Sequence, residues 1–281
     1  MLKLMYITNR PDVAQIAESA GVDRIFVDME FIGKDERQKG MDTVKSHHTV
    51  QDVAAIRASV TKAEVLVRVN PIHDALPDYV SSKDEIDAVI AAGADILMLP
   101  YFKTVEEVRT FVRLVNGRAR TMLLLETPEA AELVDEILAV PGVDEIHIGL
   151  NDLSLGYRLP FMFELLADGT VERLCRKFRE KGVPYGFGGI ASPGKGDLPA
   201  EYIIREHYRL GSGCVILSRS FCNTAKVTDT ETIRDIFTNG VAEIRAVERA
   251  CREESEDFFS DNRRELCRRV QMISERIAAA K

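Results

Sequence analysis

Two acidic residues follow two short apolar segments in the middle of the chain. Glu126 comes directly after residues 123–125, and Asp152 follows residues 146–149 by three positions. If the two segments are neighbouring parallel strands, both carboxylates emerge at the same rim of a sheet. A divalent cation such as Mg²⁺ takes oxygen ligands, with roughly one or two of them protein carboxylates. We therefore predict a cation site, and the alternative is that Glu126 stabilises a helix start and Asp152 is a turn residue.

Charged residues also stand at the ends of two earlier apolar segments. Arg68 lies in LVRVNP, where an unpaired buried charge would be costly, so it must pair or face a ligand. Its planar guanidinium suits a substrate carboxylate, and the alternative is an internal ion pair with Asp28, Glu30 or Glu126. Asp28 and Glu30, in FVDME, have the spacing of residues on one face of a strand. Either could hold metal-bound water, pair with Arg68 or act as a base.

Histidines are the usual side chains for proton transfer near neutral pH. His47 and His48 lie in the long segment after the FVDME motif and are the best placed, and the alternative for each is a surface position. His73, in the next long connection, ranks second. His147 lies inside an apolar segment and His207 inside a helical one, so we expect structural roles for both.

Glycines cluster at the ends of the last two apolar segments. Gly186, Gly188 and Gly189 lie in YGFGGIAS, and a second glycine-rich stretch begins with GSGC. Glycine lets backbone N–H groups approach an anion closely, and many barrels bind phosphate at the ends of their last two strands. A phosphate site is one interpretation, and a simple reversal of the chain is the other.

Eight short apolar segments alternate with amphipathic segments along the chain. The apolar segments contain little polar alternation, which is typical of parallel strands buried on both faces. The predicted strands are residues 2–8, 24–29, 64–69, 95–99, 120–125, 145–149, 184–187 and 213–217. The predicted helices between them include residues 12–20, 50–59, 83–92, 105–115, 128–140 and 200–210. This order predicts an α/β fold, a (β/α)8 TIM barrel, and an open doubly wound sheet is the alternative.

The longest connections follow strands rather than helices. They comprise residues 30–48, 70–82, 150–160 and 188–199, which a barrel places at its C-terminal rim, where barrel enzymes carry out their chemistry. After the last strand, residues 230–252 and 262–280 are predicted to be helices. We expect one TIM-barrel domain over residues 1–281, with residues 230–281 as a C-terminal helical extension in oligomer contacts. A solvated face is the alternative for its four clustered arginines, Arg263, Arg264, Arg268 and Arg269.

The composition argues against a nucleic-acid-binding, membrane-spanning or zinc-binding protein. The 281 residues carry a formal net charge of −8, which argues against a nucleic-acid-binding surface and favours a small-molecule ligand or a second copy of the chain. No segment approaches the roughly 20 apolar residues of a membrane span, and we expect no signal peptide in MLKLMYITNRP because its apolar run is too short. The five cysteines are scattered without zinc-ligand spacing. We therefore expect a cytoplasmic protein with reduced thiols.

The motifs together resemble the HpcH/HpaI aldolase and citrate lyase β-subunit family, within the phosphoenolpyruvate/pyruvate barrel superfamily. The resemblance covers the second to the eighth predicted strand. It rests on DME at 28–30, VRVNP at 67–71, GADILMLPYFKTVEEV at 93–108, LLLET at 123–127 and GLNDLSLG at 149–156. The last two motifs, with Glu126 and Asp152 separated by 26 positions, are the most specific.

The resemblance implies a carbon–carbon lyase that depends on Mg²⁺ or Mn²⁺ and acts on a 2-keto acid. By this resemblance Glu126 and Asp152 are the metal ligands, and Arg68 binds the keto acid and stabilises its enolate. The predicted catalytic residues are Arg68, His47, His48 and Glu30, and the predicted substrate contacts are Arg68, Asp28, Leu150, Asn151 and Asp152. The family also implies a homo-oligomer whose subunits exchange a C-terminal helix.

One position departs from the aldolase branch of the family. The motif after the second strand there continues into a histidine, and this chain has Phe31. The general base is therefore one of His47, His48, Asp28 and Glu30. Two alternatives remain beside the aldolase: a CoA-ester lyase of the citrate or malyl type, and a barrel that binds a keto acid or sugar acid without turnover.

Overall fold

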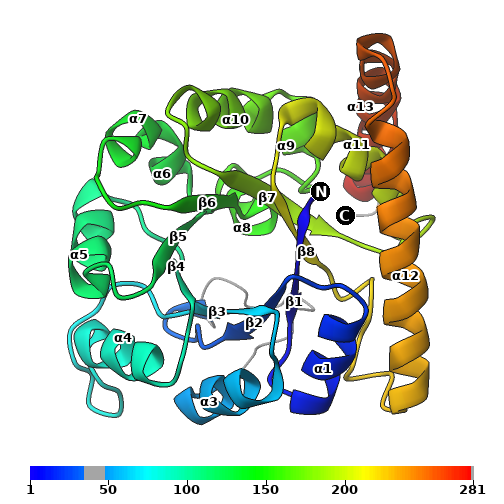
Figure 1. Ribbon diagram of the computed structural model, residues 1–281. Helices are drawn as coiled ribbons and strands as arrows, with labels where there is room; N and C mark the ends of the chain where they lie inside the picture. Colours follow the sequence, from blue (N-terminus) through cyan, green and yellow to red (C-terminus); the bar gives the residue numbers. More distant parts are fainter. Residues whose placement is uncertain (35–47, 280–281) are drawn as a thin grey trace.

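The computed structural model describes residues 1–34 and 48–279 and shows a closed barrel of eight parallel strands. The strands pair in chain order, and β8 closes the barrel by pairing with β1 (Figure 1). Their bounds are β1 Lys3–Ile7, β2 Arg24–Asp28, β3 Glu64–Arg68, β4 Ile96–Leu99, β5 Arg120–Leu125, β6 Glu145–Ile148, β7 Tyr185–Ile190 and β8 Cys214–Leu217. The predicted TIM barrel is confirmed, and closure excludes the open sheet.

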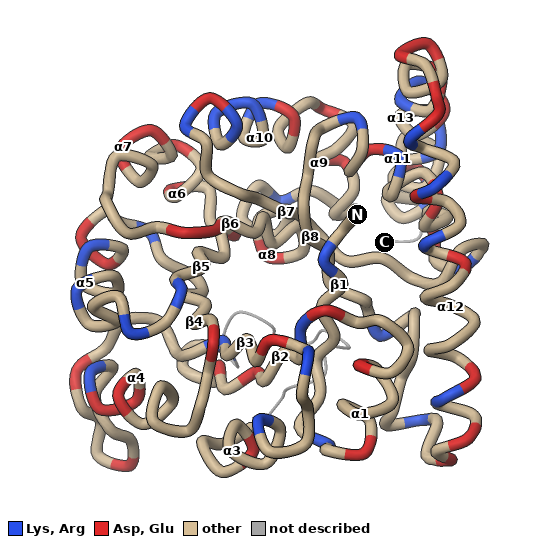
Figure 2. The backbone as a smooth tube through the Cα atoms, viewed as in Figure 1, with Lys and Arg blue, Asp and Glu red and all other residues tan. Residues whose placement is uncertain are grey.

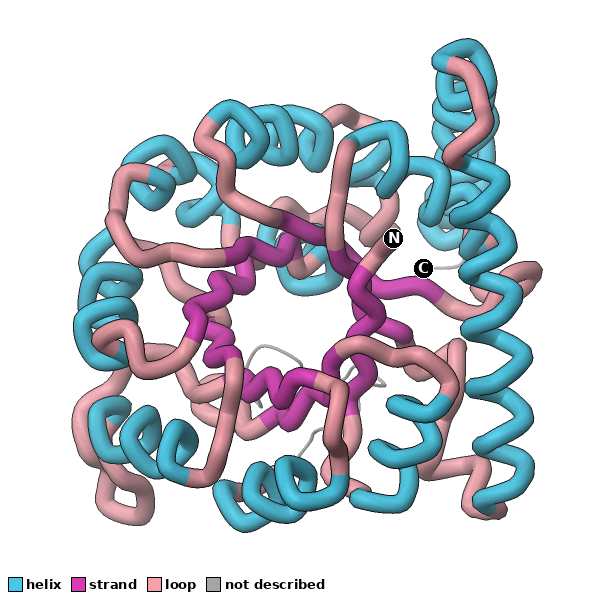
Figure 3. Tube along the Cα trace, in the orientation of Figure 1, coloured by secondary structure: helices cyan, strands magenta, loops and turns pink. Residues whose placement is uncertain are grey.

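Helices surround the barrel, as Figure 3 shows. They are α1 Pro11–Ser19, α3 Val50–Ser59, α4 Ser82–Ala91, α5 Val105–Val115, α6 Pro128–Glu132, α7 Val134–Leu138, α8 Leu150–Gly156, α9 Glu164–Ala167, α10 Thr170–Glu180, α11 Ala200–Leu210, α12 Thr230–Cys251 and α13 Glu256–Ala279. Thr49 and Thr104 form capping boxes with the acidic residues three positions later, which fixes the starts of α3 and α5. Pro128 occupies the first turn of α6.

Apolar side chains fill two regions. The larger lies between the strands and the surrounding helices, and the smaller fills the inside of the barrel. The inner group contains Met5, Phe26, Leu66, Ile96, Met98, Met122, Leu124 and Cys214. Because both faces of every strand are covered, the strands are apolar almost throughout, as the sequence predicted.

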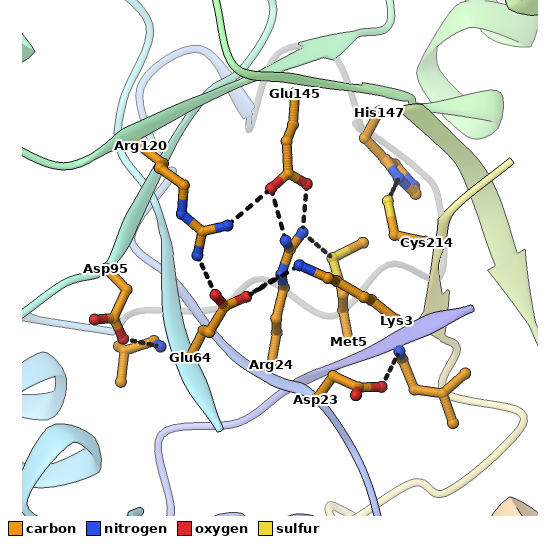
Figure 4. A network of polar contacts seen from close by, with 12 residues as sticks. Lys3, Met5, Asp23, Arg24, Glu64, Asp95, Arg120, Glu145, His147 and Cys214 are labelled. Atoms are coloured by element: carbon orange, nitrogen blue, oxygen red, sulfur yellow. Dashed lines mark hydrogen bonds and ion pairs between the residues drawn. The ribbon is translucent and has the colours of Figure 1, made fainter. Parts of the chain in front are cut away.

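A layer of charged side chains closes the N-terminal end of the barrel (Figure 4). Each comes from the first residue of a strand: Lys3, Arg24, Glu64, Arg120 and Glu145. Arg24 is fully buried and donates two hydrogen bonds of 2.7 Å to Glu145 and one of 2.9 Å to Glu64. Arg120 also pairs with both carboxylates. The two glutamates are thus shared among cations at the end opposite the C-terminal rim.

Two segments differ from the prediction. The helix predicted over residues 128–140 is two short helices, α6 and α7, separated at Leu133. The segment 150–160, predicted as a loop, contains α8, whose first turn carries Asp152. The short apolar repeat LNDLSLG buries Leu150 and Leu153 on one face of this helix, a pattern too brief to identify from periodicity alone.

The C-terminal segment divides into two parts with different roles. Helix α12 packs against α1 and α11, so it is the eighth helix of the barrel ring. Helix α13 is the additional element; it packs against α9 and α11 of the same chain and buries Leu266, Val270 and Ile273. Within residues 230–281, α13 is therefore the part that lies outside the ring of barrel helices. Exchange of this helix between subunits stays a prediction.

The arginine cluster of α13 also divides. Arg263 donates hydrogen bonds to the carbonyl oxygens of Leu166 and Ala167, and so attaches α13 to α9. Arg264 and Arg268 pair with acidic residues of their own helix and belong to a solvated face. Figure 2 shows charges of both signs spread over the outer helices. Among the described residues, no helix combines the length and apolar character of a bilayer span.

Candidate active site

Three cavities at the C-terminal ends of the strands share lining residues, and two of them are lined by Arg68. The first, of about 400 Å³, is lined by the ends of β5 to β8 and by α8. The second, of about 380 Å³, is lined by residues that follow β1, β2 and β8. Both are lined by Arg68, Ile216, Ser218 and Arg219, so together they form one cleft across the rim.

Glu126 and Asp152 both line the first cavity. Glu126 follows β5 and is 4% exposed, and its Oε1 accepts a hydrogen bond of 3.0 Å from the backbone N–H of Tyr101. Tyr101 has a left-handed backbone (φ 47°), a costly conformation that is often found at functional sites. Asp152 Oδ1 accepts a hydrogen bond of 3.0 Å from Asn151 Nδ2. The predicted convergence of the two carboxylates at one rim is therefore observed.

Gly149 is the residue that allows α8 to begin beside Glu126. A Cβ atom at this position would lie 2.8 Å from both Cβ and Oε2 of Glu126, closer than real Cβ contacts. Only glycine admits this approach without displacement of the carboxylate. The short distance between the end of β6 and Glu126 is what brings Asp152 into the same cavity.

The two carboxylates fit a divalent cation that also takes oxygen atoms from substrate and water. Carboxylate oxygens are the ligands that Mg²⁺ and Mn²⁺ prefer. Across residues 1–34 and 48–279, no group of three or more His, Cys, Asp and Glu side chains could enclose a metal ion. Glu126 and Asp152 would supply the protein ligands, and the remaining positions would be open to a chelating ligand.

Arg68 lies at the centre of a buried charge cluster with Asp28, Glu30 and Lys34. Its Nε and Nη2 donate to the two oxygens of Asp28 at 2.8 and 2.7 Å, and its Nη1 lies 3.4 Å from Glu30 Oε2. Lys34 Nζ lies 3.0 Å from Asp28 Oδ2 and 3.5 Å from Glu30 Oε2. The ion-pair alternative for Arg68 is thus observed, and Arg68 also lines both cavities. The sequence analysis did not predict a role for Lys34, because no recognisable motif contains it.

Within this cluster, the pKa shifts of Asp28 and Arg68 favour the charged forms of both side chains. Burial by itself would raise the pKa of Asp28, but Arg68 and Lys34 outweigh burial and hold it well below its usual range. Burial would likewise lower the pKa of Arg68, but Asp28, Glu30 and Glu126 raise it further above its ordinary value. Arg68 therefore stays cationic, and Asp28 is a weak proton acceptor.

His48 lines the second cavity, with its ring held by the backbone of β2. The N–H of Asp28 donates a hydrogen bond of 3.0 Å to His48 Nδ1. Burial lowers the pKa of His48, so the ring is neutral near pH 7 and carries its proton on Nε2. In this arrangement His48 presents a hydrogen-bond donor rather than a base. His47, the other predicted histidine, lies outside the described residues.

Asn70, in the VRVNP motif, holds the segment after β2 in place. Its Oδ1 accepts hydrogen bonds from the N–H groups of Phe31 and Ile32 at 2.9 and 3.0 Å. Its Nδ2 donates to Glu85 Oε1 at 3.0 Å, and burial raises the pKa of Glu85. Because Glu30 directly precedes the two clamped N–H groups, Asn70 positions the acidic side of the cluster. Sequence reasoning quoted this motif but assigned Asn70 no role.

Other predicted residues are distributed around the cleft. Leu150, Asn151 and Asp152 line the first cavity together, as predicted. Glu30 is 1% exposed and lies within the charge cluster, and Phe31 is 40% exposed and packs edge-on against Tyr79.

His73 does not line either of the two cavities, and its Nε2 forms a hydrogen bond of 3.0 Å with the carbonyl oxygen of Val80. His207 is buried and stacks on Phe187, in agreement with the structural role predicted for it.

His147 combines a structural contact with a place in the first cavity. Its Nε2 donates a hydrogen bond of 3.0 Å to the carbonyl of Gly188, and the thiol of Cys214 lies 3.7 Å from Nδ1. Gly188 has φ +56° and lies in an irregularity of the β7–β8 pairing. Burial lowers the pKa of His147 to about 4. His147 therefore stays neutral and holds the glycine-rich end of β7 against the cavity.

The fold and the site define a closed α/β barrel with two carboxylates and an arginine at its C-terminal rim. The sequence pattern of the HpcH/HpaI aldolase/citrate lyase family matches residues 3–161, more than half of the chain. The chain belongs to this family of aldolases and lyases.

The chain is similar to several known proteins and structures. A pyruvate kinase from Methylorubrum extorquens is 30% identical over 174 residues, which cover 58% of this chain and 35% of that protein. The structure of an HpcH/HpaI aldolase/citrate lyase family protein from Burkholderia cenocepacia J2315 aligns with a TM-score of 0.60 at 19% identity, covering 83% of this chain and 94% of that one. Citrate synthase SbnG aligns with a TM-score of 0.56 at 17% identity, covering 83% and 94%. At these identities the structural likeness reflects the shared fold.

Proposed function

We propose that the protein is a divalent-metal-dependent carbon–carbon lyase that acts on a 2-keto acid through an enolate. The observation that carries the proposal is that Glu126, Asp152 and Arg68 line one cavity at the C-terminal rim. A cation held by the two carboxylates, Mg²⁺ or Mn²⁺, would supply Lewis-acid stabilisation of negative charge on the keto acid. A pyruvate kinase among the similar proteins supports a pyruvate-type unit as the ligand.

The protein residues contribute charge and orientation. Arg68 stays cationic and is held by Asp28, so its guanidinium offers a fixed positive charge to a carboxylate or to an enolate oxygen. Leu150, Asn151 and Asp152 form the first turn of α8 and would orient the carboxylate of the keto acid. His48 would donate a hydrogen bond through Nε2–H to a ligand in the cleft.

Deuterium exchange at the methyl group of pyruvate tests the enolate directly. We expect exchange that requires Mg²⁺ or Mn²⁺ and that falls by about 100-fold or more in Glu126→Gln, since removal of one charged ligand weakens both the site and the stabilisation of charge. Glu132→Gln, at an exposed carboxylate of α6, should exchange like the wild type. Exchange that is independent of metal and insensitive to Glu126→Gln would contradict the proposal.

The same assay assigns the proton-transfer residue. His47→Ala, His48→Ala and Glu30→Gln should be compared at saturating pyruvate and metal, because a base that is removed lowers the exchange rate without preventing metal binding. If His48 only donates a hydrogen bond, His48→Ala will raise KM more than it lowers kcat.

A barrel that binds a keto acid without turnover is the second candidate. The observation that favours it is Phe31, at the position where the motif of the aldolase branch has histidine, together with a His48 ring that presents a donor. Calorimetric binding of pyruvate and Mg²⁺ without any exchange would support this candidate over the lyase.

A further inference from the structure

His147 and Cys214 meet inside the barrel across a residue that has no side chain. His147 on β6 pairs with Gly186 on β7, and Gly186 pairs with Cys214 on β8, so the three residues form one row across the sheet. Paired residues of neighbouring parallel strands point to the same face, so the side chains of His147 and Cys214 lie on either side of the glycine. The Cys214 Sγ lies 3.7 Å from His147 Nδ1, as Figure 4 shows.

The glycine at position 186 is what allows this contact. A Cβ atom there would lie closer to both Sγ and the carbonyl oxygen of Cys214 than real Cβ contacts do. Any larger residue would therefore push Cys214 away from His147. For the glycines of YGFGGIAS, the sequence alone allowed an anion site or a reversal of the chain. Admission of the contact between His147 and Cys214 is a third role, and it belongs to Gly186.

The hydrogen bonds of the His147 ring can run in only one direction. The carbonyl oxygen of Gly188 accepts and cannot donate, so Nε2 carries the proton of the neutral ring. Nδ1 is then an acceptor, and the thiol of Cys214 is the donor that faces it. Burial raises the pKa of Cys214 to about 12, so the thiol keeps its proton. The ring is thus held at both nitrogens, between Cys214 and Gly188.

Gly188 connects this ring to the wall of the first cavity. It has φ +56°, and a Cβ atom there would lie 2.7 Å from Cδ1 of Leu150, so β7 packs closely against the start of α8. Leu150 begins the helical turn that carries Asp152. His147, Gly188 and Leu150 all line the first cavity. The orientation of the His147 ring therefore bears on the surface that is proposed to receive the keto acid.

We propose that Cys214 is a positioning residue for the keto-acid site, and that it acts through His147 and Gly188 on the wall of the first cavity. This inference rests on the proposed lyase function. Cys214 is not among the described residues that line the first cavity, so its effect is indirect. Its thiol orients the ring of His147, and the ring holds the carbonyl group of Gly188. Gly188 in turn sets the place of Leu150 at the start of α8.

Substitutions at two buried cysteines test the inference. Cys214→Ala removes the donor to Nδ1, and the matched control Cys175→Ala removes a buried thiol of α10 that lines neither cavity. In the pyruvate-exchange assay, we expect Cys214→Ala to raise KM for pyruvate about fivefold and to change kcat by less than about twofold. A hydrogen bond between neutral groups contributes at this level, and the metal ligands are untouched. An unchanged KM in Cys214→Ala, or an equal rise in Cys175→Ala, would overturn the inference.

A hydroxyl group at position 214 distinguishes the hydrogen bond from simple packing. Cys214→Ser keeps a proton for His147 Nδ1, so its KM for pyruvate should lie between those of the wild type and Cys214→Ala. A KM equal to that of Cys214→Ala would attribute the whole effect to packing and would overturn the inference.

Nuclear magnetic resonance of protein labelled with ¹⁵N at histidine observes the ring directly. The His147 signals are assigned by their absence in His147→Gln. In the wild type, we expect a proton on Nε2 and the ¹⁵N shift of a hydrogen-bonded acceptor on Nδ1. In Cys214→Ala, the Nδ1 shift should move to that of a free acceptor, and the Nε2 proton should exchange faster with solvent. Identical His147 signals in the two proteins would overturn the inference.

Calorimetry separates this inference from the proposed function. Titration with pyruvate in the presence of Mg²⁺ should give a Kd about fivefold higher for Cys214→Ala than for the wild type, whether or not pyruvate is turned over. Equal Kd values would overturn the positioning role of Cys214. Binding of pyruvate by the wild type without any exchange would instead overturn the lyase function.

Discussion

Arg68 and Asp28 are cross-strand neighbours on β3 and β2, and their side chains are joined by two parallel hydrogen bonds of 2.8 and 2.7 Å. This bidentate geometry fixes the plane of the guanidinium as well as its position. Arg68 borders both cavities of the cleft, so the orientation imposed by Asp28 is transmitted to any ligand there.

Loss of the Asp28 charge should impair catalysis through Arg68. In Asp28→Asn the guanidinium keeps at most one of its two hydrogen bonds to this residue and loses a charge partner, so we expect pyruvate exchange to fall by about 10- to 100-fold. The control is Asp87→Asn, which removes surface ion pairs with Lys83 and Arg118. An exchange rate in Asp28→Asn equal to that of the control would show that Asp28 does not position Arg68.

A methyl group at Gly149 should disturb the proposed metal site. The added Cβ would lie 2.8 Å from Glu126 Oε2, so we expect Gly149→Ala to weaken Mn²⁺ binding by about tenfold as the carboxylate is displaced. Binding can be followed by the electron paramagnetic resonance of free Mn²⁺. Gly213→Ala is the matched control, because its Cβ meets only an ordinary contact of 3.7 Å. Equal Mn²⁺ affinities in the two variants would show that a glycine at position 149 is not needed for metal binding.

Substitutions that exchange amide and carboxylate groups test the hydrogen bonds that Asn70 makes with Phe31, Ile32 and Glu85. Asn70→Asp keeps the acceptor for Phe31 and Ile32 but sets a second carboxylate against Glu85, so we expect a loss of roughly 2 kcal/mol in the free energy of unfolding and a slower exchange reaction. Adding Glu85→Gln restores a donor towards position 70 and should recover part of both losses. Additive effects in the double variant would argue against a direct Asn70–Glu85 contact.

Acid should destabilise the fold through His147. Its pKa is about 4 in the folded protein and near 6.5 when unfolded, so the unfolded state binds the proton first and stability falls as the pH drops from about 6.5 to 4. The loss amounts to about 3 kcal/mol at most. His147→Gln keeps a donor for the Gly188 carbonyl without titrating. Urea unfolding at pH 7 and pH 4.5 should show a smaller decrease in the variant than in the wild type, and equal decreases would contradict the assignment.

In the charged layer at the N-terminal end of the barrel, removal of both Arg24 and Glu145 should lower the free energy of unfolding less than removal of Arg24 alone. Arg24→Met leaves Glu145 buried with only Arg120, and we expect the free energy of unfolding to fall by about 3 kcal/mol. Combining Arg24→Met with Glu145→Leu should recover at least half of that loss, because no buried charge is left unpaired. Arg109→Met, at an exposed pair with Glu106, should cost less than about 0.5 kcal/mol. The comparison requires denaturant unfolding of all four proteins.

The sequence determined the architecture because hydrophobic patterning is local. Eight apolar segments separated by amphipathic ones can be buried on both faces only in a parallel α/β arrangement, and the capping residues Thr49 and Thr104 marked helix starts that the structure reproduces. The position of Glu126 at the end of β5 followed from the same reasoning, since the chain direction of a parallel strand fixes the rim at which its end emerges.

Tertiary structure alone decided which side chains meet at that rim. Lys34 reaches Asp28, Asn70 clamps Phe31 across 39 positions of sequence, and Gly149 admits α8 beside Glu126. These contacts depend on strand register. They also depend on the distances between segments far apart in the chain, which must be right to within a few tenths of an ångström. No periodicity in a single segment carries that information, because each partner is selected by packing only after the barrel has closed.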